Sequence, residues 1–278
     1  MGGSGFVGSH TCFELLKRGY KVIIYDLNIN YFLQTSSQNK NILYRNNFLL
    51  KGSEIIRGNT LDISDLRRKI YKHKPNYIIN FAALPLAVTA IENTEEAFKS
   101  IILCTHNVLE ILRDCSFVQK YVHISSSMVY GDFYKFPNPE NAPKNPKEIY
   151  GSMKLSSEYI VRGYSKMHNI NSVIIRPSAV YGPTDNNFRV IQKLLSMAMT
   201  GKQIVANNPN NNFLDFTNVK DTALGITLAT IKKTKNLETF NITYGKSNSL
   251  IKVLDIIKKL VGKIDVKINK DNSFYPKR

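Results

Sequence analysis

Short runs of β-branched and other apolar residues alternate along the chain with longer stretches whose apolar residues recur at helical spacing. The short runs are residues 21–25, 54–57, 77–81, 120–124 and 172–175, and the clearest helical stretches are residues 96–112 and 150–167. Strands separated by helices form parallel βαβ units. The alternation therefore predicts an α/β fold built on a doubly wound parallel sheet.

A glycine motif opens the chain. Gly2, Gly5 and Gly8 fit the pattern GxxGxxG and lead directly into a helical stretch that ends near Gly19. Glycines at this spacing allow the backbone to approach a pyrophosphate, whose charge is met by the N–H groups at the helix N-terminus. Asp26 ends the next strand about twenty residues further on, where it can accept hydrogen bonds from ribose hydroxyls. The motif and the acid together predict a Rossmann-type dinucleotide site.

Asp26 also favours NAD over NADP, because its carboxylate would repel a ribose 2′-phosphate. The two residues that follow, Leu27 and Asn28, supply no cation that would hold such a phosphate. The expected cofactor is therefore NAD.

The chain begins where a buried strand is expected to have ended already. A glycine motif of this type normally follows such a strand, and the first strand of a doubly wound sheet is central. Met1 directly precedes the motif, so we expect the first strand to be missing and the chain alone not to fold competently. The other end stops at Arg278 without a terminating element, and we expect it to be truncated as well.

The pattern changes after Arg176. It loosens into loops, with turn clusters at residues 182–185 and 207–212. Substrate contacts in such folds come from segments beyond the strand ends. We therefore expect residues 1–176 to form the NAD-binding Rossmann domain. Residues 177–278 should form mainly a smaller C-terminal substrate-binding lobe, with some segments returning to the Rossmann domain.

Tyr150 and Lys154 lie four residues apart in a predicted helix, so they share one face of it. The ammonium can then lie beside the phenol, stabilise the phenolate and lower the pKa of the tyrosine, which makes Tyr150 a usable base near neutral pH. Ser125, Ser126 and Ser127 follow a predicted strand. A serine hydroxyl from that strand end can hold the substrate oxygen that loses or gains the proton.

These residues resemble the extended short-chain dehydrogenase/reductases, specifically their NAD-dependent nucleotide-sugar epimerase/dehydratase family, along the whole chain. The resemblance includes NFAA at residues 80–83, NVLE at 107–110, RP at 176–177, VYGP at 180–183 and LDFTNVKD at 214–221. It implies that Ser126, Tyr150 and Lys154 are catalytic. It also implies the residues that line NAD, namely Gly2, Gly5, Phe6, Val7, Gly8, Asp26, Asn59, Thr60, Phe81, Ala82, Ala83, Tyr150, Lys154 and Pro177.

The sequence departs from the family pattern around the cofactor and the substrate. Asn59 replaces an aspartate at the adenine, Ile101 a helix asparagine near the active site, Ala179 a substrate-side asparagine and Leu214 a phosphate-binding arginine. A buried phosphate is best held by a guanidinium fork, which Leu214 cannot supply. Arg189, just after the substrate loop, is the candidate replacement.

The residues beside Ser126 distinguish between the reactions of the resembled family. Its dehydratases and decarboxylases carry carboxylates there, whereas this chain has Ser127 and Met128, which cannot act as acid or base at ordinary pH. The resemblance therefore implies epimerisation of a nucleotide-activated sugar, with a UDP-hexose 4-epimerase that works through a transient 4-keto intermediate as the best fit. A nucleotide-sugar dehydratase or reductase, and a non-catalytic NAD-binding protein, are the alternatives.

Bulk properties restrict the partners and the location. The 38 basic and 21 acidic residues give a net charge of +17, but the lysines are scattered, so we expect a solvated basic surface rather than a nucleic-acid site. No apolar run is long enough to span a membrane, no signal pattern opens the chain, and the three cysteines have neither disulfide nor metal-binding spacing. We expect a cytoplasmic protein that binds no metal, nucleic acid or membrane.

The two clearest helical stretches, residues 96–112 and 150–167, carry more apolar residues than one buried face requires. Members of the resembled family pair such helices in a four-helix interface, which implies a homodimer.

Overall fold

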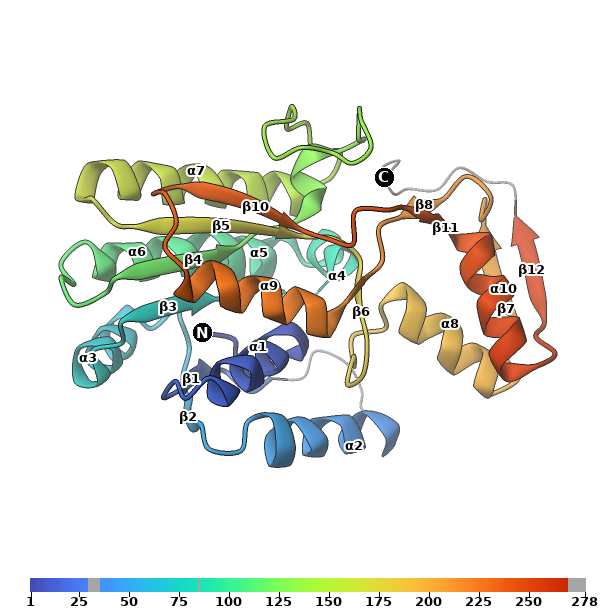
Figure 1. Cartoon of the computed structure of the whole chain (residues 1–278), viewed down its shortest axis with the longest axis horizontal. Coiled ribbons are helices and arrows are strands. Elements are labelled where there is room, and N and C mark those ends of the chain that lie inside the picture. Colours follow the sequence, from blue (N-terminus) through green and yellow to red (C-terminus); the bar gives the residue numbers. More distant parts are fainter. Residues whose placement is uncertain (30–35, 85, 270–278) are drawn as a thin grey trace.

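The computed structural model describes residues 1–29, 36–84 and 86–269. Parallel strands form the centre of the fold (Figure 1). The first group, in spatial order, is β10 (Glu238–Ile242), β5 (Ser172–Pro177), β4 (Lys120–Ile124) and β3 (Tyr77–Asn80), and the second is β1 (Ile23–Asp26) with β2 (Glu54–Arg57). All pairs within these groups are parallel. The predicted α/β fold with a parallel central sheet is confirmed.

Met1 and Gly2 lie between the two groups of strands. The Met1 amino group donates to the Ile79 carbonyl at 2.8 Å, and the Phe81 amide donates to the Met1 carbonyl at 3.0 Å. The Gly2 amide donates to the Tyr25 carbonyl at 3.0 Å. Main-chain hydrogen bonds of these two residues therefore connect β3 with β1. The expected absence of a first, central strand stays a prediction.

Helices cover both faces of the parallel strands. One face carries α3 (Ile63–His73), α6 (Cys104–Leu112) and α7 (Ile149–His168), and the other carries α1 (Phe6–Lys17) and α9 (Val219–Ile231). Successive strand residues point to opposite faces. Tyr121 of β4 accordingly packs in the first layer and Val122 in the second.

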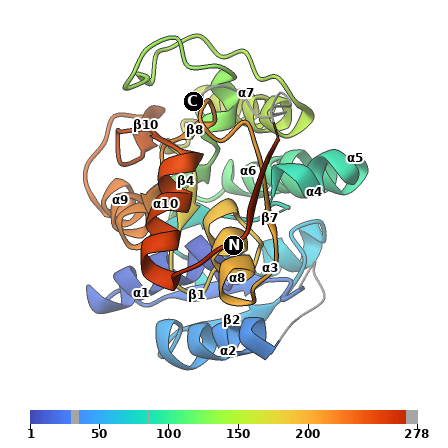
Figure 2. The ribbon, with the colours of Figure 1, turned by 90° about the vertical axis from the view of Figure 1, so that its right-hand side faces the viewer.

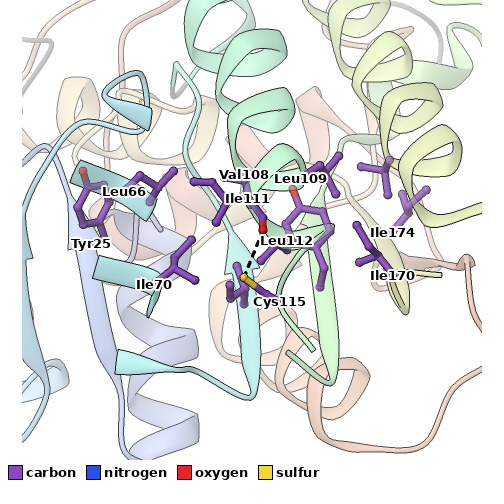
Figure 3. Packing of buried hydrophobic residues seen from close by; sticks show 13 residues of the cluster. Tyr25, Leu66, Ile70, Val108, Leu109, Ile111, Leu112, Cys115, Ile170 and Ile174 are labelled. Atoms are coloured by element: carbon purple, nitrogen blue, oxygen red, sulfur yellow. Dashed lines mark hydrogen bonds between the residues drawn. The ribbon is translucent and has the colours of Figure 1, made fainter. Parts of the chain in front are cut away.

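Figure 3 shows the apolar layer beneath α3, α6 and α7. Leu66 and Ile70 come from α3, Leu109 and Leu112 from α6, and Ile174 from β5, and all of them are buried. Burial of a side chain of this size contributes about 1.5–3 kcal/mol. Because Val161 of α7 belongs to the same layer, this packing holds α7 against the sheet.

The predicted helix over residues 96–112 is interrupted. It consists of α5 (Thr94–Phe98), a π-helical turn η2 (Lys99–Leu103) and α6. A π turn inserts one extra residue, so residues on its two sides do not follow a single helical period. A sequence pattern with a single helical period throughout therefore does not predict the interruption.

A smaller lobe lies to one side of the sheet, at the right of Figure 1 and nearest the viewer in Figure 2. In it, α8 (Val190–Met199) and α10 (Leu250–Val261) pack against the parallel pair β7 (Ile204–Asn207) and β12 (Val266–Asn269). The remaining elements are α2 (Ser36–Tyr44), η1 (Arg45–Leu49), α4 (Ala87–Glu92), η3 (Ser127–Tyr130), β6 (Val180–Tyr181), β8 (Phe213–Leu214), β9 (Thr217–Asn218) and β11 (Asn248–Ser249).

The expectation that the chain loosens into loops beyond Arg176 is wrong, because α8, α9 and α10 all follow it. The helical spacing is present in the sequence. In α10, Leu250, Val253, Leu254 and Ile257 recur at helical intervals and are all buried. Strand β10 and helix α9 also return to the large sheet, although they lie far beyond β5 in the sequence.

No helix in the described part of the chain has both the length and the apolar content needed to cross a membrane. Cys12, Cys104 and Cys115 are buried, free thiols.

Candidate active site

A cleft of about 1260 Å³ runs along the carboxyl ends of the parallel strands and is bounded on its far side by the lobe. Ligands of doubly wound sheets bind at these strand ends. The residues that the sequence singled out as catalytic or NAD-lining all lie in the wall of this cleft: Gly2, Gly5, Phe6, Val7, Gly8, Asp26, Asn59, Thr60, Phe81, Ala82, Ala83, Ser126, Tyr150, Lys154 and Pro177.

The glycine loop leaves no space for side chains. A Cβ at Gly8 would lie 2.6 Å from the Gly2 carbonyl oxygen, and a Cβ at Gly2 would lie 2.9 Å from the Ala82 nitrogen. Gly2 also has a φ of 69°, which favours glycine. Helix α1 begins at Phe6 with no side-chain cap and no acidic residue in its first turn. Its first N–H groups and its dipole therefore suit the pyrophosphate of a dinucleotide.

Asp26 is held at the end of β1 by two backbone amides. Its carboxylate accepts from the Ser4 amide and from the Asn28 amide, both at 2.9 Å. These bonds orient the carboxylate at the cleft, where its remaining lone pairs can accept from ribose hydroxyls.

Arg45 also lines the cleft, although no sequence motif predicts it there. It opens η1, is buried, and its Nε has no hydrogen-bond partner among the described residues. Burial lowers the pKa of this guanidinium, and the charges of Asp185 and Asp26 oppose that shift. A cation therefore lies near Asp26, although neither Leu27 nor Asn28 supplies one. No local motif marks Arg45, because the tertiary fold alone brings it to the cleft.

A hydrogen-bonded clasp, formed by Gln38, Asn41 and Asn186, ties α2 to the loop before α8. The Gln38 side chain donates to the Asn186 carbonyl at 3.1 Å, and the Asn186 side chain donates to the Gln38 carbonyl at 2.9 Å. Asn41 Nδ2 donates to Asn186 Oδ1 at 2.9 Å. Both Gln38 and Asn186 line the cleft, so the clasp closes one side of it.

Ser126 stands where β4 turns into η3. Its Oγ accepts from the Met128 amide at 3.1 Å and so caps η3, and the residue is 9% exposed. A short helix starting at the strand end keeps the serine hydroxyl in the cleft wall.

Tyr150 and Lys154 occupy the first turns of α7. The helix begins after Glu148, whose carboxylate accepts from the Tyr150 and Gly151 amides at 2.8 and 2.9 Å. Lys154 Nζ donates to the Ile124 carbonyl at 2.9 Å and lies 5.8 Å from the centre of the Tyr150 ring. The predicted shared face of the two residues is thus present, and the ammonium is anchored to the end of β4.

Burial controls the protonation of Lys154. The side chain is buried, and this lowers the pKa of its ammonium to about 8, while Cys104 and Glu158 partly oppose the shift. The neighbouring imidazole of His123 is neutral, because burial lowers its pKa to about 3. The charge of Lys154, beside Tyr150, is therefore expected to change near pH 8.

The positions that depart from the family pattern divide into two groups. Ala179 and Leu214 line the cleft, as does Asn59, whose side chain accepts from the Leu61 amide at 3.0 Å. Ile101 is instead buried in an apolar cluster outside the cleft wall, so its substitution changes packing.

Arg189 reaches the cleft from the start of α8. Its guanidinium lies 5.1 Å from the Phe6 ring, beside the N-terminus of α1, and its Nη1 is 2.8 Å from Asp185 Oδ1. The arginine that the sequence offered as a replacement for a phosphate ligand is therefore close to the predicted pyrophosphate site.

A parallel sheet, a glycine loop before an uncapped helix, and a serine, tyrosine and lysine at one cleft define a dinucleotide-dependent enzyme of the short-chain dehydrogenase/reductase class. The chain belongs to the NAD dependent epimerase/dehydratase family, whose model matches residues 1–243. NAD is its cofactor.

The comparisons include both epimerases and dehydratases. A putative UDP-glucose 4-epimerase of Methanocaldococcus jannaschii is 30% identical over 94% of this chain and 81% of that protein. A UDP-glucuronic acid 4-epimerase from Bacillus cereus, solved in complex with UDP-glucuronic acid and NAD, has a TM-score of 0.88 and 26% identity, covering 99% of this chain and 87% of that chain. A dTDP-D-glucose 4,6-dehydratase of Dictyostelium discoideum is 24% identical over 94% of this chain and 60% of that protein.

Asp26 and Arg45 lead to a prediction about cofactor choice. The wild type should bind NAD more tightly than NADP. In Asp26→Ala, the ratio of the NADP to the NAD dissociation constant should fall by about tenfold, because the change removes the ribose acceptor and the negative charge that neighbours Arg45. Titration calorimetry on protein stripped of cofactor measures both affinities. In the control Asp26→Ala/Arg45→Met, the gain for NADP should disappear. Equal affinities of the wild type for NAD and NADP would contradict the assignment.

Lys154 leads to a prediction about pH. Its folded pKa is depressed, so the ammonium is present below pH 8 and is lost as the pH rises through about 8. Turnover by the NAD-bound enzyme should therefore decline above that pH, because the phenolate of Tyr150 loses its neighbouring charge. Initial rates between pH 6 and 10, with NAD occupancy checked at each end, measure the decline. A rate that stays level to pH 10 would rule out this role for the ammonium.

Proposed function

We propose that the protein catalyses NAD-dependent 4-epimerisation of a UDP-activated hexose. The observation that carries the proposal is the convergence of Ser126, Tyr150 and Lys154 at one cleft, next to Ser127 and Met128, which supply no carboxylate. Ser126, Tyr150 and Lys154 can together move a proton at a sugar hydroxyl, whereas the elimination of water by a dehydratase needs a further acid and base. Both epimerase relatives named above are consistent with this reaction.

In the proposed reaction, Tyr150 as phenolate removes the proton from the hydroxyl on C4 of the sugar. When bound, NAD would supply the hydride chemistry at C4. The 4-keto sugar would turn in the cleft, so that its opposite face is presented before the C4 hydroxyl forms again. Tyr150 then returns the proton to the C4 oxygen, so that the product is an isomer of the substrate and the protein ends unchanged.

The other two residues support this proton transfer. The Lys154 ammonium, fixed by its bond to the Ile124 carbonyl, stabilises the phenolate. The Ser126 hydroxyl is suited to hold the C4 oxygen as it changes between alcohol and ketone. The net charge of +17 would attract the diphosphate of the substrate, and Arg189, which lines the cleft, is the residue proposed to hold it in place of the arginine that Leu214 replaces.

The proposal predicts that Tyr150→Phe abolishes epimerisation but keeps NAD bound, since the change deletes the proton-transfer group and little volume. The loss should be on the order of 10²–10⁴-fold. Wild type and variant are incubated with UDP-glucose, UDP-glucuronic acid, UDP-N-acetylglucosamine and dTDP-glucose, and NAD content is measured in parallel. Isomeric products are separated from one another, and the mass of each product is measured by mass spectrometry.

Each outcome of this assay identifies one reaction. An isomer of unchanged mass supports epimerisation, loss of water supports a dehydratase, and gain of two hydrogens supports a reductase. A wild type that binds NAD but converts none of the sugars would favour a non-catalytic NAD-binding protein. Appreciable turnover by Tyr150→Phe would remove Tyr150 from its proposed role.

We also propose that the enzyme is a cytoplasmic homodimer formed through α6 and α7. Helix α7 and the turn before α6 leave apolar side chains exposed, including Tyr159 and Leu103. Light scattering at micromolar concentration should give twice the monomer mass, and Tyr159→Glu should reduce it to the monomer by burying a charge. Leu260→Glu, on the exposed side of α10, should leave the dimer intact. A monomeric wild type would contradict this proposal.

A further inference from the structure

A buried ion pair lies behind the catalytic residues. Arg176 Nε donates to Glu158 Oε1 at 2.8 Å, and Arg176 Nη2 donates to Glu158 Oε2 at 2.6 Å. Both side chains are 1% exposed, and neither residue lines the cleft. Two parallel N–H···O bonds fix the relative orientation of the groups as well as their separation.

The ion pair connects the segments that carry the catalytic residues. Glu158 lies one turn after Lys154 on the same face of α7. The Ser125 hydroxyl donates to Glu158 Oε1 at 2.6 Å, and Ser125 is the immediate neighbour of Ser126. One carboxylate of α7 is therefore bonded both to Arg176 of β5 and to the residue that follows β4.

The guanidinium of Arg176 holds the other end of the serine-bearing turn. Its Nη1 donates to Tyr130 Oη at 2.6 Å and to the Glu140 carbonyl at 3.0 Å. Tyr130, which ends η3, donates in turn to Asn241 Oδ1 of β10 at 2.8 Å. The turn from Ser126 to Tyr130 is thus fixed at both ends by one ion pair.

We propose that Glu158 and Arg176 are positioning residues of the reaction proposed above, holding Ser126 in register with the helix face of Tyr150 and Lys154. This inference rests on the proposed function. A buried ion pair seldom stabilises a fold more than apolar side chains of the same volume. The ion pair can instead serve to position the reacting groups, because a displacement of about 1 Å at those groups can lower the rate on the order of 10²-fold.

Two serine variants test the proposal without breaking the ion pair. Ser125→Ala removes the bond between Glu158 and the end of β4. Ser165→Ala is the matched control, since it removes a buried bond to Ser172 Oγ, 2.7 Å long, from the same helix. Ser125→Ala should lower kcat by about tenfold or more, with KM and bound NAD unchanged, whereas Ser165→Ala should keep the wild-type kcat. Urea unfolding should show similar losses of stability in both.

Glu158→Gln adds a measurement that a purely structural role would not change. The ammonium of Lys154 is faced by Cys104 from α6, His123 from β4, and Tyr150 and Glu158 from α7. Burial raises the pKa of the Cys104 thiol and lowers that of the His123 imidazole. Loss of the Glu158 charge should therefore move the alkaline decline of kcat to lower pH. Should Glu158→Gln fail to fold, the serine pair still decides.

Equal kcat in the two serine variants, or an unchanged pH profile in a folded Glu158→Gln, would overturn the proposal. Wild-type turnover tests the proposed function separately. If the wild type is inactive, crystal structures of the serine variants decide instead. A displacement of Ser126 relative to Lys154 in Ser125→Ala alone supports positioning, and an unmoved Ser126 overturns it.

Discussion

The hydrogen bond from the Lys154 ammonium to the Ile124 carbonyl is the interaction on which the site depends. A buried charge is costly unless its donors are satisfied, so α7 can dock on the sheet only where a strand end offers a carbonyl. The apolar layer of Figure 3 supplies the attraction between α7 and the sheet but does not by itself fix a register. Directional bonds add this, from Lys154 to the end of β4 and between Glu158 and Arg176, and the lysine bond brings Tyr150 to the same strand end as Ser126.

The ion pair beneath the cleft is satisfied by hydrogen bonds within the protein, whereas two donor groups at the cleft are left open. Glu158 and Arg176 use their hydrogen bonds within the protein. By contrast, the N-terminus of α1 is uncapped and Arg45 Nε has no partner in the described part of the chain. Unsatisfied donors that are held rigidly suit an anionic ligand, because they need no reorganisation when it binds. Both groups therefore suit the phosphates of a dinucleotide.

Features that depend on short sequence separations could be predicted. Strand and helix alternation, the glycine loop with Asp26, and the shared face of Tyr150 and Lys154 all follow from local geometry. Arg45 could not be found in this way, since only the fold carries it to Asp26. Strand β10 joins β5 through a pairing of residues far apart in the sequence, which no local pattern encodes. The helices of the lobe differ from these features, because the apolar spacing of α10 is present in the sequence and by itself favours a helix.

The π turn at η2 decides which side chain its helix presents to the cleft. Ser100 lines the cleft, and its hydroxyl accepts from the Leu84 amide at 3.2 Å, while the next residue, Ile101, points into the core. One residue corresponds to a rotation of about 100° around a helix. Removing a single residue from this turn would rotate α5 and shift Ala97 away from its buried position. Deleting or inserting one residue in this turn can thus change which side chains line this wall of the cleft, without the substitution of any residue in the helix.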